Sequence, residues 1–373
     1  EWLASTYASA MVEICRSMNL PLEMVNIIVK IAEDLLRNRS ENPAVMAICA
    51  GTHSSIARML RRYNDIRAFH YMEKSEQALS SISKEEVRNL AKIRVWIDKA
   101  RFLSFSEINE AWHWAENAFS LIEKVRERIK DYASNIFVCD YFKPLGGNVE
   151  EKLNTQLDKN YRDVKCLLGE IYQDFDWLED AEDAFKEALK YTIRIDDELA
   201  SHSRIARIKV LSTFQFDNFE ELYEKAKDYE IVLPPEHKAG IFVEYVLSCM
   251  ISEKEAEEEE MKEAMEQIKT NLIAYALLLG TAHKIFGRFD RKEVLKSLER
   301  LEMELRGSST GTLALILKKL IENERGRALE VAERAGYANI PLLSRLFAEL
   351  AEGIRRDEEE TNKALVKLFY FHV

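Results

Sequence analysis

The sequence predicts an all-α protein, and three observations support this prediction. Of the 373 residues only 12 are Gly and 6 are Pro, about 5% together against an average near 12%. A sheet-rich fold needs a turn residue roughly every ten positions, so these residues are too sparse for one. Apolar residues instead recur with a helical period of about 3.6. Hydrophobic residues make up 47% and charged residues 32%, enough for a large core under a charged surface.

Short polar breaks separate about eighteen predicted helices, each about 12 to 25 residues long. In chain order the breaks lie near residues 19–21, 40–43, 64–65, 104–106, 143–148, 174–176, 196–197, 217–218, 233–235, 287–290, 307–311, 338–339 and 356–357. Several of them place Asp, Asn or Ser where the side chain would cap the next helix. Because the breaks recur about every 15 to 22 residues, we expect antiparallel helical hairpins joined by short turns.

Residues 162–195 contain the clearest repeat unit. Its signature residues are Leu168, Gly169, Tyr172, Ala181, Phe185 and Ala188. The small residues stand where two helices would cross closely, and the aromatic rings would fill the space beside them. These residue types at these spacings resemble the tetratricopeptide repeat. The sequence departs from the family pattern at Lys165, where a large apolar residue is usual, and at Ile193, where Pro is usual.

The resemblance implies a right-handed α-solenoid, a superhelix of about eight or nine antiparallel hairpins that each pack on their sequence neighbours. Weaker matches to the second helix of the repeat recur through the chain, starting at residues 68, 111, 222, 261, 294 and 328. Any amphipathic helix offers similar apolar spacing. An irregular all-helical bundle therefore stays the alternative.

The single Pro/Gly cluster, at residues 143–148, indicates a hinge or an enlarged loop. We expect degenerate helical hairpins over 1–140, a loop or hinge over 141–150 and tetratricopeptide-like repeats over 151–373, together forming one continuous solenoid. The chain opens with Glu1, without Met or a signal peptide. We therefore expect further native sequence upstream.

The formal net charge is −12, from 53 Lys and Arg against 65 Asp and Glu. This excess of acid counts against broad binding of nucleic acid, although Arg58, Arg61, Arg62 and Arg67 could form a local basic strip. Five cysteines stand far apart without a Cys-x-x-Cys pair, which indicates reduced, mostly buried thiols and a cytoplasmic protein. No apolar window is long enough to span a membrane.

No catalytic motif in the sequence predicts an enzyme. No Walker A motif is present, and the Gly- and Ser-rich segment at 307–312 is typical of a helix cap, with anion binding as the alternative. The seven histidines lack metal-ligand spacing. The acidic run at 253–260 indicates a solvated helix start or a docking segment. We expect no catalytic residue, no metal and no cofactor.

The resemblance also implies a binding surface, because the first helices of such repeats line a concave face. The residues expected there are Asp163, Cys166, Glu170, Gln173, Asp174, Arg204, Arg207, Leu211 and Phe214. Glu170 could instead pair with Arg204 or Arg207 in a purely structural role. The acidic residues would repel a carboxylate, so a basic or mixed-charge peptide or helix fits this groove better.

Two functions follow from this surface. We expect a non-catalytic scaffold that binds a protein or peptide partner. The alternative is the C-terminal sensor domain of a larger signal-transduction ATPase or transcription regulator, since similar helical repeats serve that role.

Overall fold

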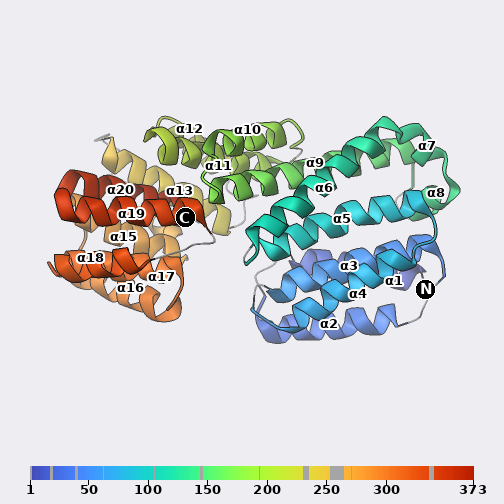
Figure 1. Ribbon diagram of the computed structural model, residues 1–373, viewed down its shortest axis with the longest axis horizontal. Coiled ribbons are helices and arrows are strands. Elements are labelled where there is room, and N and C mark those ends of the chain that lie inside the picture. Colours follow the sequence, from blue (N-terminus) through green and yellow to red (C-terminus); the bar gives the residue numbers. More distant parts are fainter. Residues whose placement is uncertain are drawn as a thin grey trace. The chain divides into compact units, whose positions relative to one another are not determined.

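Every regular element in the described part of the chain is a helix, and no strand occurs there, so the all-α prediction is confirmed (Figure 1). The computed structural model describes residues 2–16, 20–37, 41–61, 63–104, 106–142, 146–192, 194–229, 235–252, 264–269, 271–335 and 340–373. The predicted breaks near 233–234 and 338–339 and the acidic run at 253–260 lie outside these residues.

The chain divides into two compact units, Glu1–Ile171 and Tyr172–Val373, called unit 1 and unit 2 below. The division falls inside one helix, α9 (Val149–Asp174). The segment expected to be a loop or hinge, 141–150, comes earlier in the chain. Its described part includes the end of one helix, Phe142, and the start of the next, Val149, with Gly146 and Gly147 between them in the left-handed region of φ.

Unit 1 is built from antiparallel helices around an apolar core. Its helices are α1 (Trp2–Arg16), α2 (Leu22–Leu36), α3 (Pro43–Arg61), α4 (Arg67–Ser81), α5 (Glu85–Leu103), α6 (Ile108–Glu127), α7 (Ile129–Ser134), α8 (Ile136–Phe142) and most of α9. The central helix is α3, which packs against α1, α4 and α5. α5 in turn packs against α6.

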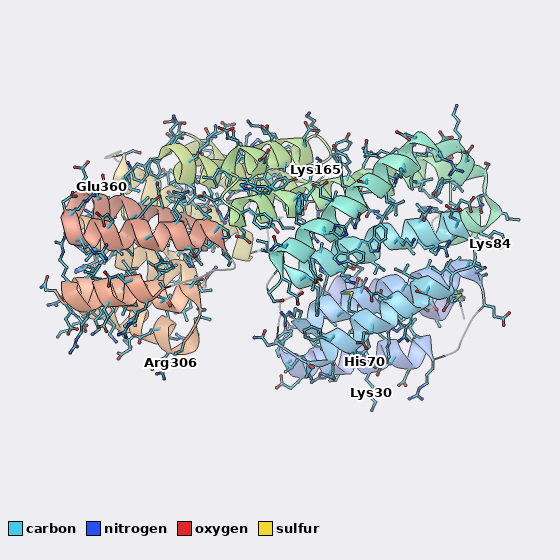
Figure 2. The ribbon with its side chains drawn as sticks, viewed as in Figure 1. Lys30, His70, Lys84, Lys165, Arg306 and Glu360 are labelled. Atoms are coloured by element: carbon cyan, nitrogen blue, oxygen red, sulfur yellow. The ribbon has the colours of Figure 1, made fainter. Side chains whose placement is uncertain are left out.

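Small residues let these helices approach closely. On α6, Ala111, Ala115 and Ala118 are completely buried, at the spacing that the second-helix pattern predicts. On α4 the corresponding residues Ala68, Met72 and Ser75 are also buried. A single face of each helix therefore carries the core contacts, while charged side chains such as Lys30 and Lys84 project from the surface (Figure 2).

Unit 2 continues the alternation of helices and short turns. Its helices after α9 are α10 (Leu178–Leu189), α11 (Ile195–Thr213), α12 (Phe219–Asp228), α13 (Pro235–Ile251), α15 (Leu272–Phe286), α16 (Arg291–Glu304), α17 (Ser309–Ile321), α18 (Arg325–Arg334), α19 (Pro341–Arg356) and α20 (Glu358–His372). Most described helices pack on the next helix in sequence, and α20 also contacts α11 and α15. Through these two contacts, the last helix of unit 2 packs against helices from earlier in the same unit.

Several predicted breaks are confirmed by their capping hydrogen bonds. The Asp290 carboxylate accepts from the backbone N–H groups of Lys292 and Glu293 at the start of α16. Ser308 accepts from Gly311 at 3.0 Å, so the segment at 307–312 forms a helix cap, as favoured from the sequence. Asp357 caps α20 in the same way. Each cap satisfies amides that the first turn of a helix leaves unpaired.

One glycine marks a close approach of two helices. A Cβ on Gly353 of α19 would lie 2.7 Å from the backbone nitrogen of Thr361 in α20. Backbone atoms cannot move aside as a flexible side chain can, so we expect Gly353→Ala to lower the free energy of unfolding by about 1–3 kcal/mol. Chemical denaturation measures this change.

The matched control is Gly326→Ala, because nothing lies within 4 Å of a Cβ at this helical position in α18. This control is expected to leave the protein unchanged or more stable by up to about 1 kcal/mol. An unaltered stability of Gly353→Ala would contradict the close α19–α20 packing.

Candidate functional site

The nine residues predicted to bind a partner are divided between the two units. Asp163, Cys166 and Glu170 belong to unit 1, and the other six belong to unit 2. Glu170 is exposed, whereas Asp163 is half-buried and pairs with Arg162 at 2.8 Å. Burial raises the pKa of Asp163, but the positive charges of Arg101 and Arg162 outweigh it and hold that pKa below its ordinary value.

Within unit 2, the predicted binding residues differ in accessibility. Gln173, Asp174 and Arg204 are partly exposed. Leu211 is only 1% exposed and belongs to the hydrophobic core, so its placement on a binding face is corrected. An apolar side chain at this position gains more from the core than from a polar surface.

Phe214 ends α11 in a left-handed conformation, with a φ of 58°. Its ring packs edge-on against Phe216, with the ring centroids 5.0 Å apart. This residue therefore has a clear structural role at the end of the helix.

The described residues of the repeat signature occupy buried positions in their own units. Leu168 and Gly169 are buried on α9 in unit 1. Ala181, Phe185 and Ala188 are fully buried on α10 in unit 2, and Tyr172 packs partly buried against the same core. The helices α9 and α10 are separated at residues 175–177, beside the break predicted from the sequence.

A polar pocket of about 220 Å³ lies between α11 and α13 in unit 2 and is lined by Arg204 and Arg207. We call it the α11–α13 pocket. Ser203 and Asp196 contribute polar groups from α11, and Gly240 of α13 forms part of the opposite wall. Two of the nine predicted binding residues, Arg204 and Arg207, thus line the same pocket.

A buried carboxylate holds Arg207 in position. Glu244 of α13 is completely buried and forms an ion pair with Nε of Arg207. The hydroxyl of Ser203 donates to the same carboxylate at 2.9 Å, and the hydroxyl of Tyr370 donates to the backbone oxygen of Glu244 at 2.9 Å. Burial raises the pKa of Glu244, although Arg207 and Ser203 favour its charged form.

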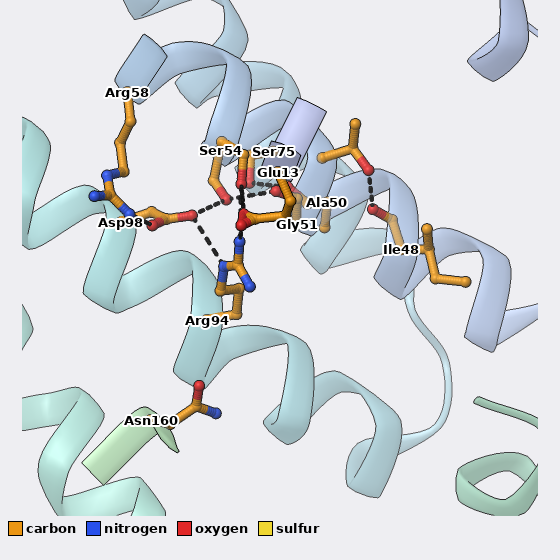
Figure 3. Close-up of polar contacts among 12 residues, drawn as sticks. Glu13, Ile48, Ala50, Gly51, Ser54, Arg58, Ser75, Arg94, Asp98 and Asn160 are labelled. Carbon is orange, nitrogen blue, oxygen red and sulfur yellow. Dashed lines mark hydrogen bonds and ion pairs between the residues drawn. The ribbon is translucent and has the colours of Figure 1, made fainter. Parts of the chain in front are cut away.

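Unit 1 contains the same device. Asp98 of α5 is 1% exposed and accepts hydrogen bonds from Ser54 at 2.7 Å and from Arg58 at 2.5 Å (Figure 3). Arg94 reaches the second oxygen of Asp98 at 3.3 Å and also pairs with Glu13 of α1. In each unit, a serine and an arginine one turn apart on one helix thus hold a buried carboxylate from the next helix but one.

A short sequence pattern, which is not among the motifs considered above, accompanies this arrangement in both units. The pattern Ser-x-Ile-Ala-Arg occurs at 54–58 and again at 203–207. The Ile and Ala of both copies are buried, while the Ser and Arg point to the carboxylate. Arg58 therefore serves the interior of unit 1, which corrects its assignment to a basic surface strip. Arg67 of that strip pairs locally with Asp65.

A second pocket, of about 620 Å³, lies in unit 1 and is lined by Cys49, His53 and Lys74 among others. Burial raises the pKa of the Cys49 thiol. Burial also lowers the pKa of His53 to about 4, and its Nδ1 has no hydrogen-bond partner among the described residues. A protonated thiol beside a weakly basic imidazole lacks the activation that a nucleophilic cysteine needs.

The remaining features concern metals, cysteines and membranes. No group of three or more His, Cys, Asp or Glu side chains within the described ranges could hold a metal ion. All five cysteines are free thiols, and only Cys249 is fully buried, so the expectation of mostly buried thiols is corrected. Among the helices that the structure describes, none is long and apolar enough to cross a membrane.

Comparison with models of known protein families found no match, and comparison with curated proteins found none either.

The buried carboxylate of unit 1 gives a stability prediction. Asp98→Ala would remove the carboxylate partner of Arg58 and one of the two carboxylate partners of Arg94, so we expect the free energy of unfolding to fall by about 3–5 kcal/mol. The control is Asp158→Ala, which removes a partly exposed ion pair with Arg126 and should cost about 1 kcal/mol or less. Urea denaturation compares the two, and equal effects would rule out the special role of Asp98.

The pKa of His53 gives a pH prediction. The unfolded chain binds a proton at His53 near pH 6.5, whereas the folded unit does so only near pH 4. Between these values the unfolded state holds more protons, so stability falls as the pH is lowered. His372 in unit 2, with a pKa of about 4 through burial, acts in the same direction.

Unfolding by urea at about pH 7 and about pH 5 tests this. We expect His53→Gln to lose less stability than the parent protein over this interval. The control, His113→Gln, changes an exposed residue. If His53→Gln and the parent lose the same stability, the folded protein binds the proton as readily as the unfolded chain.

Proposed function

We propose that the protein is a non-catalytic scaffold that binds an amphipathic helix of a partner protein. The observation that carries this proposal is an exposed apolar stripe on each of the first two helices of unit 1. Exposed apolar side chains in water do not stabilise a fold, and contiguous apolar patches on a protein surface mark interaction sites.

The stripe on α1 is formed by Leu3, Tyr7, Ala10 and Ile14. All four are exposed, and Leu3 is 76% exposed. Their spacing of four, three and four residues is the heptad pattern by which helices pack against each other. The other side of α1 carries Ala8 and Val12, which are fully buried. This helix is therefore apolar on two sides, and the described residues of unit 1 cover only one of them.

The stripe on α2 is formed by Met24, Ile27 and Ile31, again at spacings of three and four residues. Ile27 is 58% exposed. The core contacts of α2 come from other positions, among them Val25 and Val29. Because α1 packs against α2, a single hairpin of unit 1 carries both stripes.

Charge favours a basic or mixed-charge partner. The chain has a formal net charge of −12, which attracts positively charged surfaces and speeds their association. Around the α2 stripe, the exposed residues Glu23, Lys30 and Asp34 carry both signs. Such flanking charges select the orientation of a bound helix, while the apolar stripe supplies the affinity.

The tetratricopeptide-like solenoid remains part of this proposal. The buried repeat signature at 162–195 and the succession of hairpins support it. The groove predicted around Glu170 and Asp174 is then a second binding surface, separate in the sequence from the α1 and α2 stripes. Each surface can be tested by its own variants.

The double variant Ile27→Ser with Ile31→Ser tests the α2 stripe. It removes exposed apolar contacts without touching the core, so we expect partner binding to weaken at least about tenfold while the melting temperature stays the same. The matched control is Met303→Ser, because Met303 is 68% exposed on α16 in unit 2. Affinity capture identifies the partner, and calorimetry with its isolated helix measures the dissociation constants.

A partner that binds the double variant as tightly as the parent protein would overturn the α2 assignment. In that case, Glu170→Lys with Asp174→Lys shows whether the predicted groove is used instead. A partner unaffected by both double variants would contradict both surfaces.

A further inference from the structure

We propose that the α11–α13 pocket binds a small oxyanion, a carboxylate or a phosphate group, through the terminal nitrogens of Arg207. This inference goes beyond the scaffold function, because it concerns a small ligand and a different unit of the protein. It would make unit 2 a ligand-responsive domain, in line with the sensor alternative drawn from the sequence.

Glu244 holds Arg207 by one edge of its guanidinium group. The ion pair uses Nε, which shares one side edge of the group with a single terminal nitrogen, so the edge formed by the two terminal nitrogens faces another direction. Among the described residues, no hydrogen bond of those terminal nitrogens is found, and the side chain is 24% exposed. A planar guanidinium anchored from one edge presents its other donors in a fixed direction, which suits bidentate binding of an oxyanion.

The arginines around the buried carboxylate of unit 1 are arranged differently. There, Arg58 uses a terminal nitrogen for Asp98, and Arg94 supplies a further donor to the same carboxylate. Asp98 of unit 1 thus accepts hydrogen bonds from two arginines, whereas the arginine contact of Glu244 is with Nε of Arg207. The two units share the Ser-x-Ile-Ala-Arg pattern but differ in where the arginine directs its terminal donors.

A glycine leaves space in the pocket next to Arg207. A Cβ on Gly240 would lie 3.8 Å from Nη2 of Arg207, so the glycine forms the wall next to the guanidinium group. A long side chain at this position would fill the space in front of it. The volume of about 220 Å³ is below the roughly 300–1,000 Å³ of pockets for drug-sized ligands. It suits a small anion.

Charged side chains surround the pocket. Arg204 also lines the pocket, as do Asn271 and Val373. The carboxylate of Asp196 also faces this region, but it is neutralised by Arg194 through hydrogen bonds of 2.7 and 3.0 Å. Glu244 lies behind Arg207 and receives the Ser203 hydroxyl. The guanidinium group of Arg207 is therefore the cation that a small anion would meet in this pocket.

A bound anion would connect two helices. Arg207 and Arg204 belong to α11, while the opposite wall belongs to α13. A ligand that binds only the folded unit stabilises it by mass action. Binding is thus expected to appear as a rise in melting temperature that saturates with concentration.

The experiment titrates the full chain separately with inorganic phosphate and with acetate, with sodium chloride adjusted to keep the ionic strength constant. Melting temperature and the guanidinium NMR signal of Arg207 are followed. At least one of the two anions should shift both in a saturable way. Gly240→Met should weaken that response at least tenfold, because the longer side chain fills the pocket and leaves the Arg207–Glu244 pair intact.

Two further variants keep this test decisive. Gly326→Met changes an open helical glycine elsewhere in unit 2 and should respond as the parent does. Arg207→Gln combined with Glu244→Gln removes the guanidinium group without leaving a buried charge, and it should abolish the response. Variants that fail to fold are recognised by their circular dichroism before titration.

The outcomes separate the ligand classes. Saturation by phosphate alone assigns a phosphate group to the ligand, and saturation by acetate assigns a carboxylate. The proposal is overturned if neither anion shifts the Arg207 signal up to about 50 mM. It is equally overturned if Gly240→Met responds as strongly as the parent protein, because the anion would then bind elsewhere on the surface.

Discussion

A buried carboxylate, paired with an arginine of another helix, constrains each half of this protein. Asp98 ties α5 to α3 in unit 1, and Glu244 ties α13 to α11 in unit 2. Burying a charge is costly unless it is paired and hydrogen-bonded, so only one axial position of each helix pair satisfies these groups. Apolar contacts alone would tolerate sliding by a turn. We infer that the carboxylates fix the helix register and that the remaining packing follows from it.

Much of the secondary structure was predictable from the sequence, because it depends on local signals. Apolar periodicity and capping residues such as Asp290 and Ser308 located helices and breaks. Burial within a single helix was also predictable, as the alanines of α6 show. The partners of Asp98 were not predictable, because Ser54 lies 44 residues and Arg58 lies 40 residues before it in the sequence.

The candidate sites were less predictable than the helices. A helical pattern indicates which residues share a face, but it does not say whether that face meets a neighbour or solvent. Leu211 lies one turn after Arg207 on the same helix, yet Leu211 is a core residue and Arg207 lines a pocket. The stripes on α1 and α2 show the opposite case. Their apolar residues are of the type that fills cores, and only the arrangement of the surrounding helices shows that they are exposed.

The shared Ser-x-Ile-Ala-Arg device also bears on how such a chain can evolve. Each buried carboxylate depends on several groups at once, so losing any single member leaves an unpaired charge or an unsatisfied donor. Substitutions at Ser203, Arg207 and Glu244 are therefore expected to be strongly epistatic. Related chains should either retain all three or replace them together with apolar residues of similar volume. Covariation at these positions, rather than invariance of any one, would be the evolutionary record of this constraint.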